Sequence, residues 1–207
     1  MAYEGSGKLP EGDKGGFTPR GRGYLFIDVA GFVALVHSCF GKVHRVYKRA
    51  QIRRIFEEYD WVVHYEDKVT GRKVLAEGKI EHEHEKDTAV FLAQMDYDVV
   101  FAPQKMFKRD EKKFDVFLLR DTIILKADLK HVSSKNPDHI AKRIREGSEQ
   151  ASRVVLNIVS NVDKGILINA LRKGVERNKL IKEILLIYKG KFYKLSKLTI
   201  LHKNFSM

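Results

Sequence analysis

The chain has 207 residues, which is enough for one well-cored domain or for one domain with a smaller attachment. Hydrophobic residues make up 43% of the chain and charged residues 32%, a balance typical of a soluble globular protein. The formal net charge of +12 favours a polyanionic partner, either nucleic acid or an anionic membrane surface, over a soluble protein that is merely basic. The single cysteine, Cys39, excludes an intrachain disulfide and a zinc site built from cysteines.

The first 40 residues contain a glycine-rich leader followed by an apolar stretch. We expect residues 1–23 to be flexible, because glycines, prolines and scattered charges dominate them. Residues 24–40 are apolar but interrupted by Asp28 and His37, and they fall short of the roughly 20 clean apolar residues that a membrane span needs. The pattern therefore predicts a buried helix or strand pair, and no membrane span.

Residues 42–60 have the spacing of an amphipathic helix with one strongly basic face, which includes Arg49 and Arg53. Such a face is either simply solvated or a contact surface for phosphates. Residues 61–78 predict a β-hairpin, because two β-rich runs flank a turn at 67–71. We treat residues 24–78 as an N-terminal extension.

The rest of the chain, residues 79–207, predicts an α/β domain. A charged run leads into a helix with the apolar residues Ala89, Leu92 and Ala93 on one face, and alternating strands and helices follow. The expected strands are 97–103, 114–119, 122–130, 153–159, 183–190 and 191–198, and the later helices are 138–152 and 165–177. This order predicts a mixed central sheet flanked by helices, which the hairpin extends or packs beside.

Charged residues in the two strands 114–119 and 122–130 are the most informative feature. Asp128 interrupts an apolar run, and Lys126 and Lys130 share its strand face, because side chains alternate along a strand. One interpretation is a solvent-exposed Lys-Asp-Lys ladder beside an ordinary strand-edge Asp115. The other is a site, because burying a lone carboxylate is costly unless a cation compensates it.

The segment from about 83 to 158 resembles the PD-(D/E)XK nuclease superfamily, and more closely the C-terminal nuclease domains of CdiA-type contact-dependent growth inhibition toxins, which cleave tRNA. The resemblance rests on a helix with an early acid before a strand, an aspartate opening FDVFLL, the D-x-K signature at 128–130, and a helix ending in Gln-Ala before an apolar strand. Phe114 stands where the family has proline, and Asp128 where glutamate is commoner.

This resemblance implies a restriction-endonuclease-like core and a set of site residues. Glu85, Asp115 and Asp128 would bind Mg²⁺ or Mn²⁺, Lys130 would act at the phosphate, and Gln150 would support the site. Hard carboxylate ligands suit these ions, which assist phosphodiester hydrolysis by activating water and screening charge.

Other residues have weaker assignments. The cations Lys142, Arg143, Arg145, Arg49 and Arg53 are predicted to contact the nucleic-acid backbone. His82 and His84 are expected to be solvated, with metal ligation as the alternative, whereas alternation places His131 on the strand face away from the site. Gly147 is predicted to be a turn or cap glycine.

The predicted function is a metal-dependent endonuclease that hydrolyses phosphodiester bonds, with RNA favoured over DNA by the toxin resemblance. The alternatives are a DNA endonuclease of a mobile element, a nucleic-acid-binding module without chemistry, and a protein that binds membrane surfaces through residues 42–54. The resemblance also implies a cytoplasmic site of action, delivery as a secreted toxin domain, and an immunity protein as partner.

Overall fold

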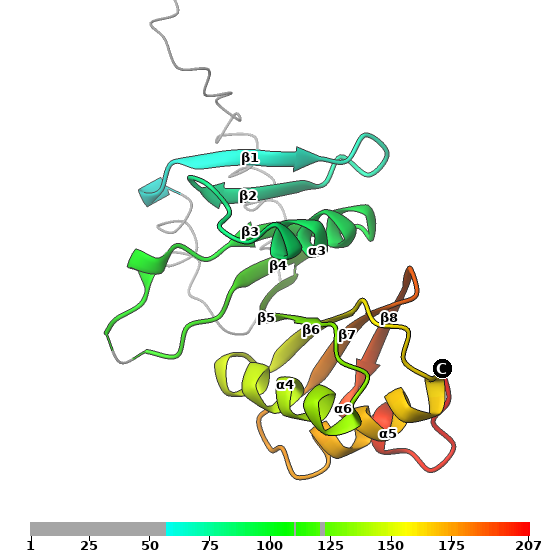
Figure 1. Cartoon of the computed structure of the whole chain (residues 1–207). Helices are drawn as coiled ribbons and strands as arrows, with labels where there is room; N and C mark the ends of the chain where they lie inside the picture. The colour runs from blue at the N-terminus through cyan, green and yellow to red at the C-terminus, as the bar shows by residue number, and fades with distance from the viewer. Residues whose placement is uncertain (1–56, 110, 121–122) are drawn as a thin grey trace, which may run out of the picture.

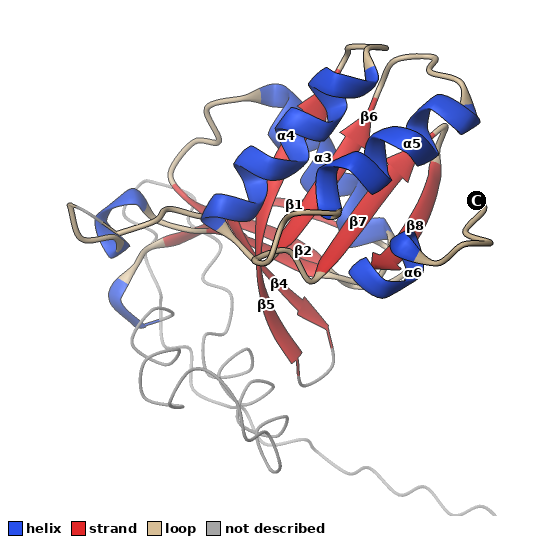
Figure 2. Ribbon diagram, turned by 90° about the horizontal axis from the view of Figure 1, so that it is seen from below, coloured by secondary structure: helices blue, strands red, loops and turns tan. Residues whose placement is uncertain are grey.

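The computed structural model describes residues 57–109, 111–120 and 123–207, and the secondary structure of this part is α/β. Its eight strands form one mixed sheet in the order β1 to β8, with helices packed on it (Figures 1 and 2). The predicted fold class, a mixed sheet flanked by helices, is confirmed. The predictions for the leader, the apolar stretch, the basic helix with Arg49 and Arg53, and Cys39 lie outside the described residues.

The predicted hairpin is present and extends the sheet. Strands β1 (Trp61–Glu66) and β2 (Lys73–Glu77) pair antiparallel, and β2 pairs in parallel with β3 (Asp98–Phe101). Asp67 closes the turn, because its Oδ1 accepts the N–H groups of Val69 (3.1 Å) and Thr70 (2.7 Å).

Helix α3 (Glu83–Gln94) covers one face of the first half of the sheet. Its buried residues Ala89, Leu92 and Ala93 pack in one core with residues of β3, β4 (Val116–Arg120) and β5 (Ile123–Val132). Strand β4 follows a 3₁₀ turn, η2 (Gln104–Met106), and pairs antiparallel with both β3 and β5.

Helices α4 (Pro137–Gln150) and α5 (Lys164–Val175) lie side by side over the opposite face (Figure 2). Both begin at sequence-encoded caps: Oδ1 of Asn136 accepts the N–H of Asp138 (2.8 Å), and Oδ1 of Asp163 accepts that of Gly165 (2.7 Å). Their apolar stripes bury Ile144 and Leu171 in a second core. Burial of each such side chain stabilises the fold by about 1.5–3 kcal/mol.

The second half of the sheet contains β6 (Arg153–Ile158) and β7 (Glu183–Tyr188), which are parallel, and β8 (Lys191–Ser196), which pairs antiparallel with β7. The sequence predicted a strand over residues 191–198, but the strand ends at Ser196, and a short helix α6 (Lys197–Leu201) follows it. Ser196 is its cap, because its hydroxyl accepts the N–H of Thr199 (3.0 Å). No helix in the described part of the chain has the length and apolar character that a bilayer crossing requires.

Candidate active site

Strand β5 changes its pairing partner at Asp128. It pairs antiparallel with β4 as far as the Val116–Ala127 pair, and in parallel with β6 from Asp128 onward. Asp115 lies just before β4, and its Oδ2 accepts the N–H of Leu129 (2.7 Å). The carboxylate thereby occupies the place of a backbone acceptor at the point where β4 and β5 part, and it comes to lie beside Asp128.

The Asp128 side chain is fully buried, with an exposed fraction of 0%. Nζ of Lys130 lies 2.5 Å from its Oδ2, but outside hydrogen-bonding geometry, so that Oδ2 accepts no hydrogen bond. The shared strand face that alternation predicts for the two residues is confirmed. The alternative of an exposed Lys-Asp-Lys ladder is wrong, because α4 and the neighbouring strands cover the carboxylate.

The charge of Asp115 influences the ionisation of Asp128. Burial, and after it the negative charge of Asp115, raise the pKa of the Asp128 carboxyl to about 7 against the opposing effect of the Lys130 ammonium. This coupling requires the two carboxyl groups to be close together. Two like charges that lie close together away from water are common at functional sites. A cation bound between them would offset their mutual repulsion.

Gln150 and Gly147, both in the last two turns of α4, complete the surroundings of Asp128. Oriented by its hydrogen bonds, the Gln150 amide nitrogen donates to Oδ1 of Asp128 (2.6 Å) and to the carbonyl oxygen of Lys113 (2.8 Å). Gly147 lies so close that a Cβ there would stand 2.8 Å from Oδ2 of Asp128. The sequence identified Gln150, but it placed Gly147 at a turn or cap. In fact Gly147 lies within α4, where only a missing side chain lets the helix approach the carboxylate.

Glu85 lies in the first turn of α3 and is half-buried. Burial raises its pKa, and the charge of Asp115 adds to this rise, while His82, His84 and Lys130 oppose it. Glu85 is therefore within electrostatic range of Asp115 and Lys130. Even so, no three His, Cys, Asp or Glu side chains among residues 57–109, 111–120 and 123–207 are gathered closely enough to hold a metal ion.

The chemistry of the two aspartates nevertheless fits a hard divalent cation. Magnesium is commonly held by one or two carboxylates, with water and substrate phosphates completing its octahedron. Asp115 and Asp128 supply two carboxylates, and Oδ2 of Asp128 is a buried oxygen that accepts no hydrogen bond. Because the Lys130 ammonium pairs with this oxygen, a metal ion would share it with Lys130.

The three predicted backbone-binding cations of α4 do not share one surface. Lys142 and Arg143 form ion pairs with Glu146, and Arg143 lies on the flank of α4 that also carries Gln150. Arg145 lies on the other flank and lines a hollow of about 620 Å³ between α4 and the end of α5. Lys173 and Arg177 also line this hollow, at helix C-termini whose dipoles they complement, so their charge alone does not indicate an anion site.

The histidines form a row on the face of β5 that α3 covers. The ring centroids of His82 and His84 are 5.4 Å apart, and those of His84 and His131 are 4.9 Å apart. The prediction that His131 points away from Asp128 is confirmed, and His82 and His84 are exposed, as expected for a solvated segment.

Comparison of the chain with models of known protein families, with curated proteins and with solved structures found no match.

Proposed function

We propose that the protein is a metal-dependent nuclease that hydrolyses phosphodiester bonds. The observation that carries the proposal is the pair of neighbouring aspartates, the half-buried Asp115 and the fully buried Asp128, with the Lys130 ammonium 2.5 Å from Asp128. Two carboxylates and an ammonium at one point on a sheet provide the groups that metal-assisted phosphodiester hydrolysis needs.

The connection of the elements supports a PD-(D/E)XK-like core. The elements follow one another in the chain as α3, β3, β4, β5, α4 and β6. The strands β3, β4 and β5 are antiparallel neighbours in the sheet, and β6 lies parallel to β5. The aspartate before the second of these strands and the D-x-K of the third lie where the two strands separate. This agreement concerns topology, and the assignment to the superfamily rests on it together with the motif.

In the proposed reaction, a Mg²⁺ or Mn²⁺ ion would, when bound, lower the pKa of water and screen charge on the phosphate. Asp115 and Asp128 would hold the ion, and Glu85 would accept a hydrogen bond from a water molecule bound there. Lys130 donates to a phosphate oxygen and stabilises the charge that develops on it. Gln150 fixes the orientation of Asp128 through its 2.6 Å hydrogen bond.

The test is incubation with total tRNA, ribosomal RNA and plasmid DNA, with Mg²⁺ or with EDTA. We expect Mg²⁺-dependent cleavage, with RNA, and tRNA above all, favoured over DNA. Asp128→Asn keeps the size of the side chain and should abolish cleavage while the circular dichroism spectrum stays unchanged. Retained cleavage in that variant contradicts the assignment.

Asp98→Asn is the matched control, because Asp98 is also a buried strand aspartate. Its Oδ2 accepts from Arg72 Nη1 (2.9 Å), at a distance from the pairing switch in β5. This variant should melt at a lower temperature but cleave like the wild type.

A second candidate is a nucleic-acid-binding module without chemistry. The absence of a third gathered ligand among the described residues favours it. Such a module retains its affinity in EDTA, shows steep salt dependence and releases no product. The same incubations, with binding measured in parallel, separate it from a nuclease.

The toxin resemblance leads to three further proposals: that the protein acts in the cytoplasm, that it is delivered as a secreted toxin domain, and that it has an immunity partner. Co-purification from the producing cell, followed by addition of the captured protein to the cleavage assay, tests the immunity partner.

A further inference from the structure

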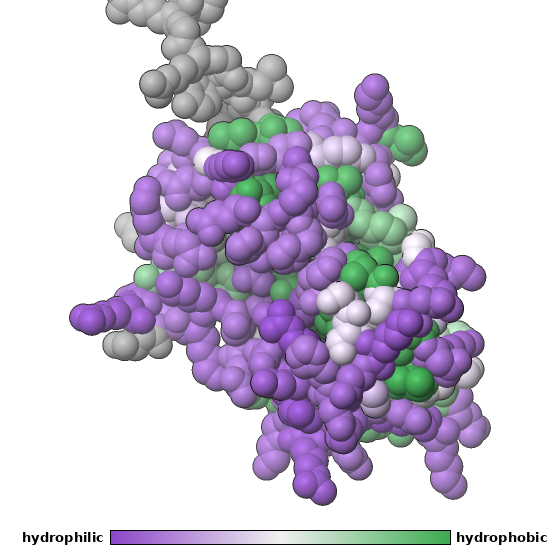
Figure 3. All heavy atoms as spheres, viewed as in Figure 1, coloured by the Kyte–Doolittle hydropathy of each residue, from purple (hydrophilic) through white to green (hydrophobic). Residues whose placement is uncertain are grey.

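A loop rich in cations leads directly into the proposed site. We define the basic loop as residues 104–109 and 111–113, between β3 and β4. Its cations are Lys105, Lys108, Arg109, Lys112 and Lys113, and its one described acid is Glu111. The sequence places one further acid, Asp110, outside the described residues. Figure 3 shows hydrophilic side chains standing out from the molecule where this loop lies in Figure 1.

Aromatic packing holds the base of the loop. Phe114 is 3% exposed, and its ring meets those of Phe107 and Phe117 edge-on, with centroids 5.1 Å and 4.9 Å away. Such contacts contribute about 0.5–1.5 kcal/mol each beyond their area burial. The apolar residues therefore turn inward, and the cations of the loop are left exposed.

Three of these cations have no ion-pair partner in the part of the chain that the structure describes. Lys105 pairs with Glu77 (3.0 Å), and Nζ of Lys113 donates to Gln104 (3.3 Å). Lys108, Arg109 and Lys112 form no ion pair with any described residue. Like charges close together on one short loop repel each other, and a bound polyanion relieves that repulsion.

The position of the loop links these charges to the site. The loop ends one residue before Phe114 and two before Asp115, and the carbonyl oxygen of Lys113 accepts from Gln150, which also donates to Asp128. A chain of two hydrogen bonds thus joins the loop to the buried carboxylate. A phosphate held by the loop and a phosphate held at Asp128 can therefore belong to one strand.

We propose that the basic loop binds the sugar-phosphate backbone of a polynucleotide next to the link that is cut. The proposal rests on the proposed function for the nature of its ligand. It makes the substrate a polymer, since a phosphodiester with no flanking backbone has nothing for Lys108, Arg109 and Lys112 to contact. Lys108, Arg109 and Lys112 belong to no α-helix, so an α-helix dipole does not explain their charges.

The test measures binding without chemistry. In an Asp128→Asn background, the triple variant Lys108→Gln, Arg109→Gln, Lys112→Gln is titrated into a labelled single-stranded RNA across a range of salt concentrations. We expect about tenfold weaker binding at moderate salt. The slope of log affinity against log salt should be less steep by about 2, because each lost phosphate contact on a single strand removes about 0.7.

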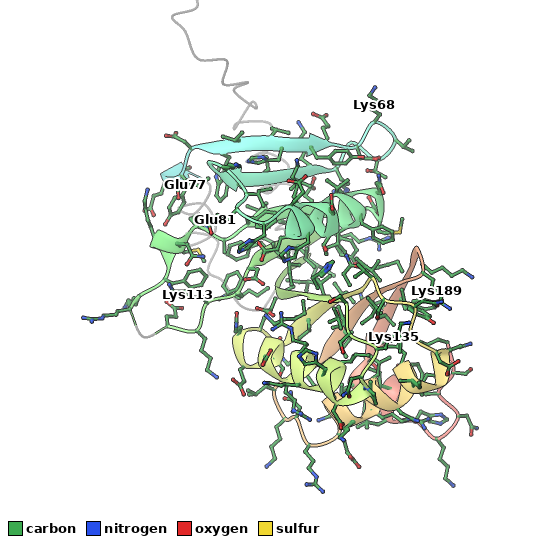
Figure 4. The ribbon with its side chains drawn as sticks, in the orientation of Figure 1. Lys68, Glu77, Glu81, Lys113, Lys135 and Lys189 are labelled. Atoms are coloured by element: carbon green, nitrogen blue, oxygen red, sulfur yellow. The ribbon has the colours of Figure 1, made fainter. Side chains whose placement is uncertain are left out.

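The matched control removes three exposed lysines elsewhere: Lys68, Lys135 and Lys189, each changed to Gln. Figure 4 shows them on the opposite side of the molecule from Lys113. The control should leave both affinity and salt slope unchanged. Equal losses in the two triple variants, or no loss in the loop variant, overturn the proposal.

A second comparison separates this proposal from the nuclease assignment. In the Asp128-intact protein, the loop variant should raise KM for RNA while hydrolysis of bis(p-nitrophenyl) phosphate stays at the wild-type rate. If the wild type cleaves neither substrate but the loop variant still binds RNA less tightly, the nuclease assignment fails and the loop proposal stands. If the wild type cleaves RNA and the loop variant has the same KM and affinity, only the loop proposal fails.

Discussion

The two halves of strand β5 have the same backbone conformation but different surroundings. Residues 123–127 form the second strand of a hairpin with β4, and at its tip Ile123 is 53% exposed. Residues 128–132 pair with β6 instead, under α4, and begin with a carboxylate that is fully buried. One half completes a local hairpin, and the other lies in the interior of the sheet.

The difference shows why the candidate site lies where it does. Where a strand changes partner, backbone groups on the abandoned side lose their ladder bonds, and side chains can take over. Asp115 does this when it accepts the N–H of Leu129. The separation of β4 from β5 thus brings a second carboxylate to Asp128.

Replacing the two lysines of β5 tests this contrast most strongly. Lys130→Met removes the ammonium beside Asp128 and should lower kcat about 10²–10³-fold, the usual cost of losing one donor to a developing oxyanion. Lys126 occupies the same strand face in the hairpin half, with Nζ 4.4 Å from the Phe114 ring centroid. Lys126→Met should change kcat far less. Both kcat values are measured with RNA at saturating Mg²⁺. Equal losses from the two substitutions would contradict a particular role of the second half of β5 in cleavage.

Two glycine substitutions, with smaller expected effects, test whether the close approach of α4 to Asp128 matters for metal binding. In Gly147→Ala, the new Cβ would stand 2.8 Å from Oδ2 of Asp128 and 3.0 Å from Val154 Cγ2. The carboxylate must turn away, so the affinity for Mn²⁺ should fall about 10–100-fold, as for other changes that disturb the orientation of metal ligands. Isothermal titration with Mn²⁺ measures this directly, without any need for cleavage.

Gly174→Ala is the control for that experiment. Its Cβ would stand 2.8 Å from Cδ1 of Ile144, an equally close collision between α5 and α4 but without a carboxylate. It should lower the melting temperature and leave Mn²⁺ affinity unchanged. A Gly147→Ala protein that binds Mn²⁺ like the wild type would show that the close approach matters for packing alone.

Periodicity and turn chemistry were sufficient to predict most of the architecture. The alternation in 114–119 and 122–130, the Asn136 and Asp163 caps and the turn at 67–71 all encode their structure locally, so the strands and helices lie close to where the sequence predicts them. The D-x-K face was also predictable, because Asp128 and Lys130 are two residues apart in one strand.

The distances between helices and strands could not be predicted from the sequence. Gly147 is a helix residue whose role depends on how closely α4 approaches β5, and nothing within its own turn of sequence encodes that approach. Glu85 matched the family pattern, yet its separation from the aspartates is set by how α3 packs on the sheet. The strand predicted to residue 198 ended early, because Ser196 caps a helix, a signal that competes with the alternating pattern of 191–198.

The last prediction concerns stability and pH. The pKa of the Asp128 carboxyl is raised to about 7 in the folded protein, mainly by burial and by Asp115, whereas the ordinary value is 3.8. The folded state therefore binds this proton more tightly than the unfolded state does, and the resulting stability is full below pH 4 and is lost as the pH rises through 7.

Asp128→Asn cannot lose that proton, so the variant and the wild type should diverge across this pH window. With EDTA present, the melting temperature of the variant should exceed that of the wild type by an amount that grows from pH 4 to pH 7 and is constant above it. We expect a difference of about 10 °C at pH 7, since each pKa unit between the folded and unfolded states corresponds to about 1.4 kcal/mol and 1 kcal/mol shifts the melting temperature of a domain this size by about 2–4 °C. Saturating Mg²⁺ should reverse the difference above pH 7, because the ion stabilises the ionised carboxylate of the wild type alone. A melting-temperature difference that does not change with pH would place Asp128 in an environment where it ionises normally, and the paired-carboxylate geometry would then be wrong.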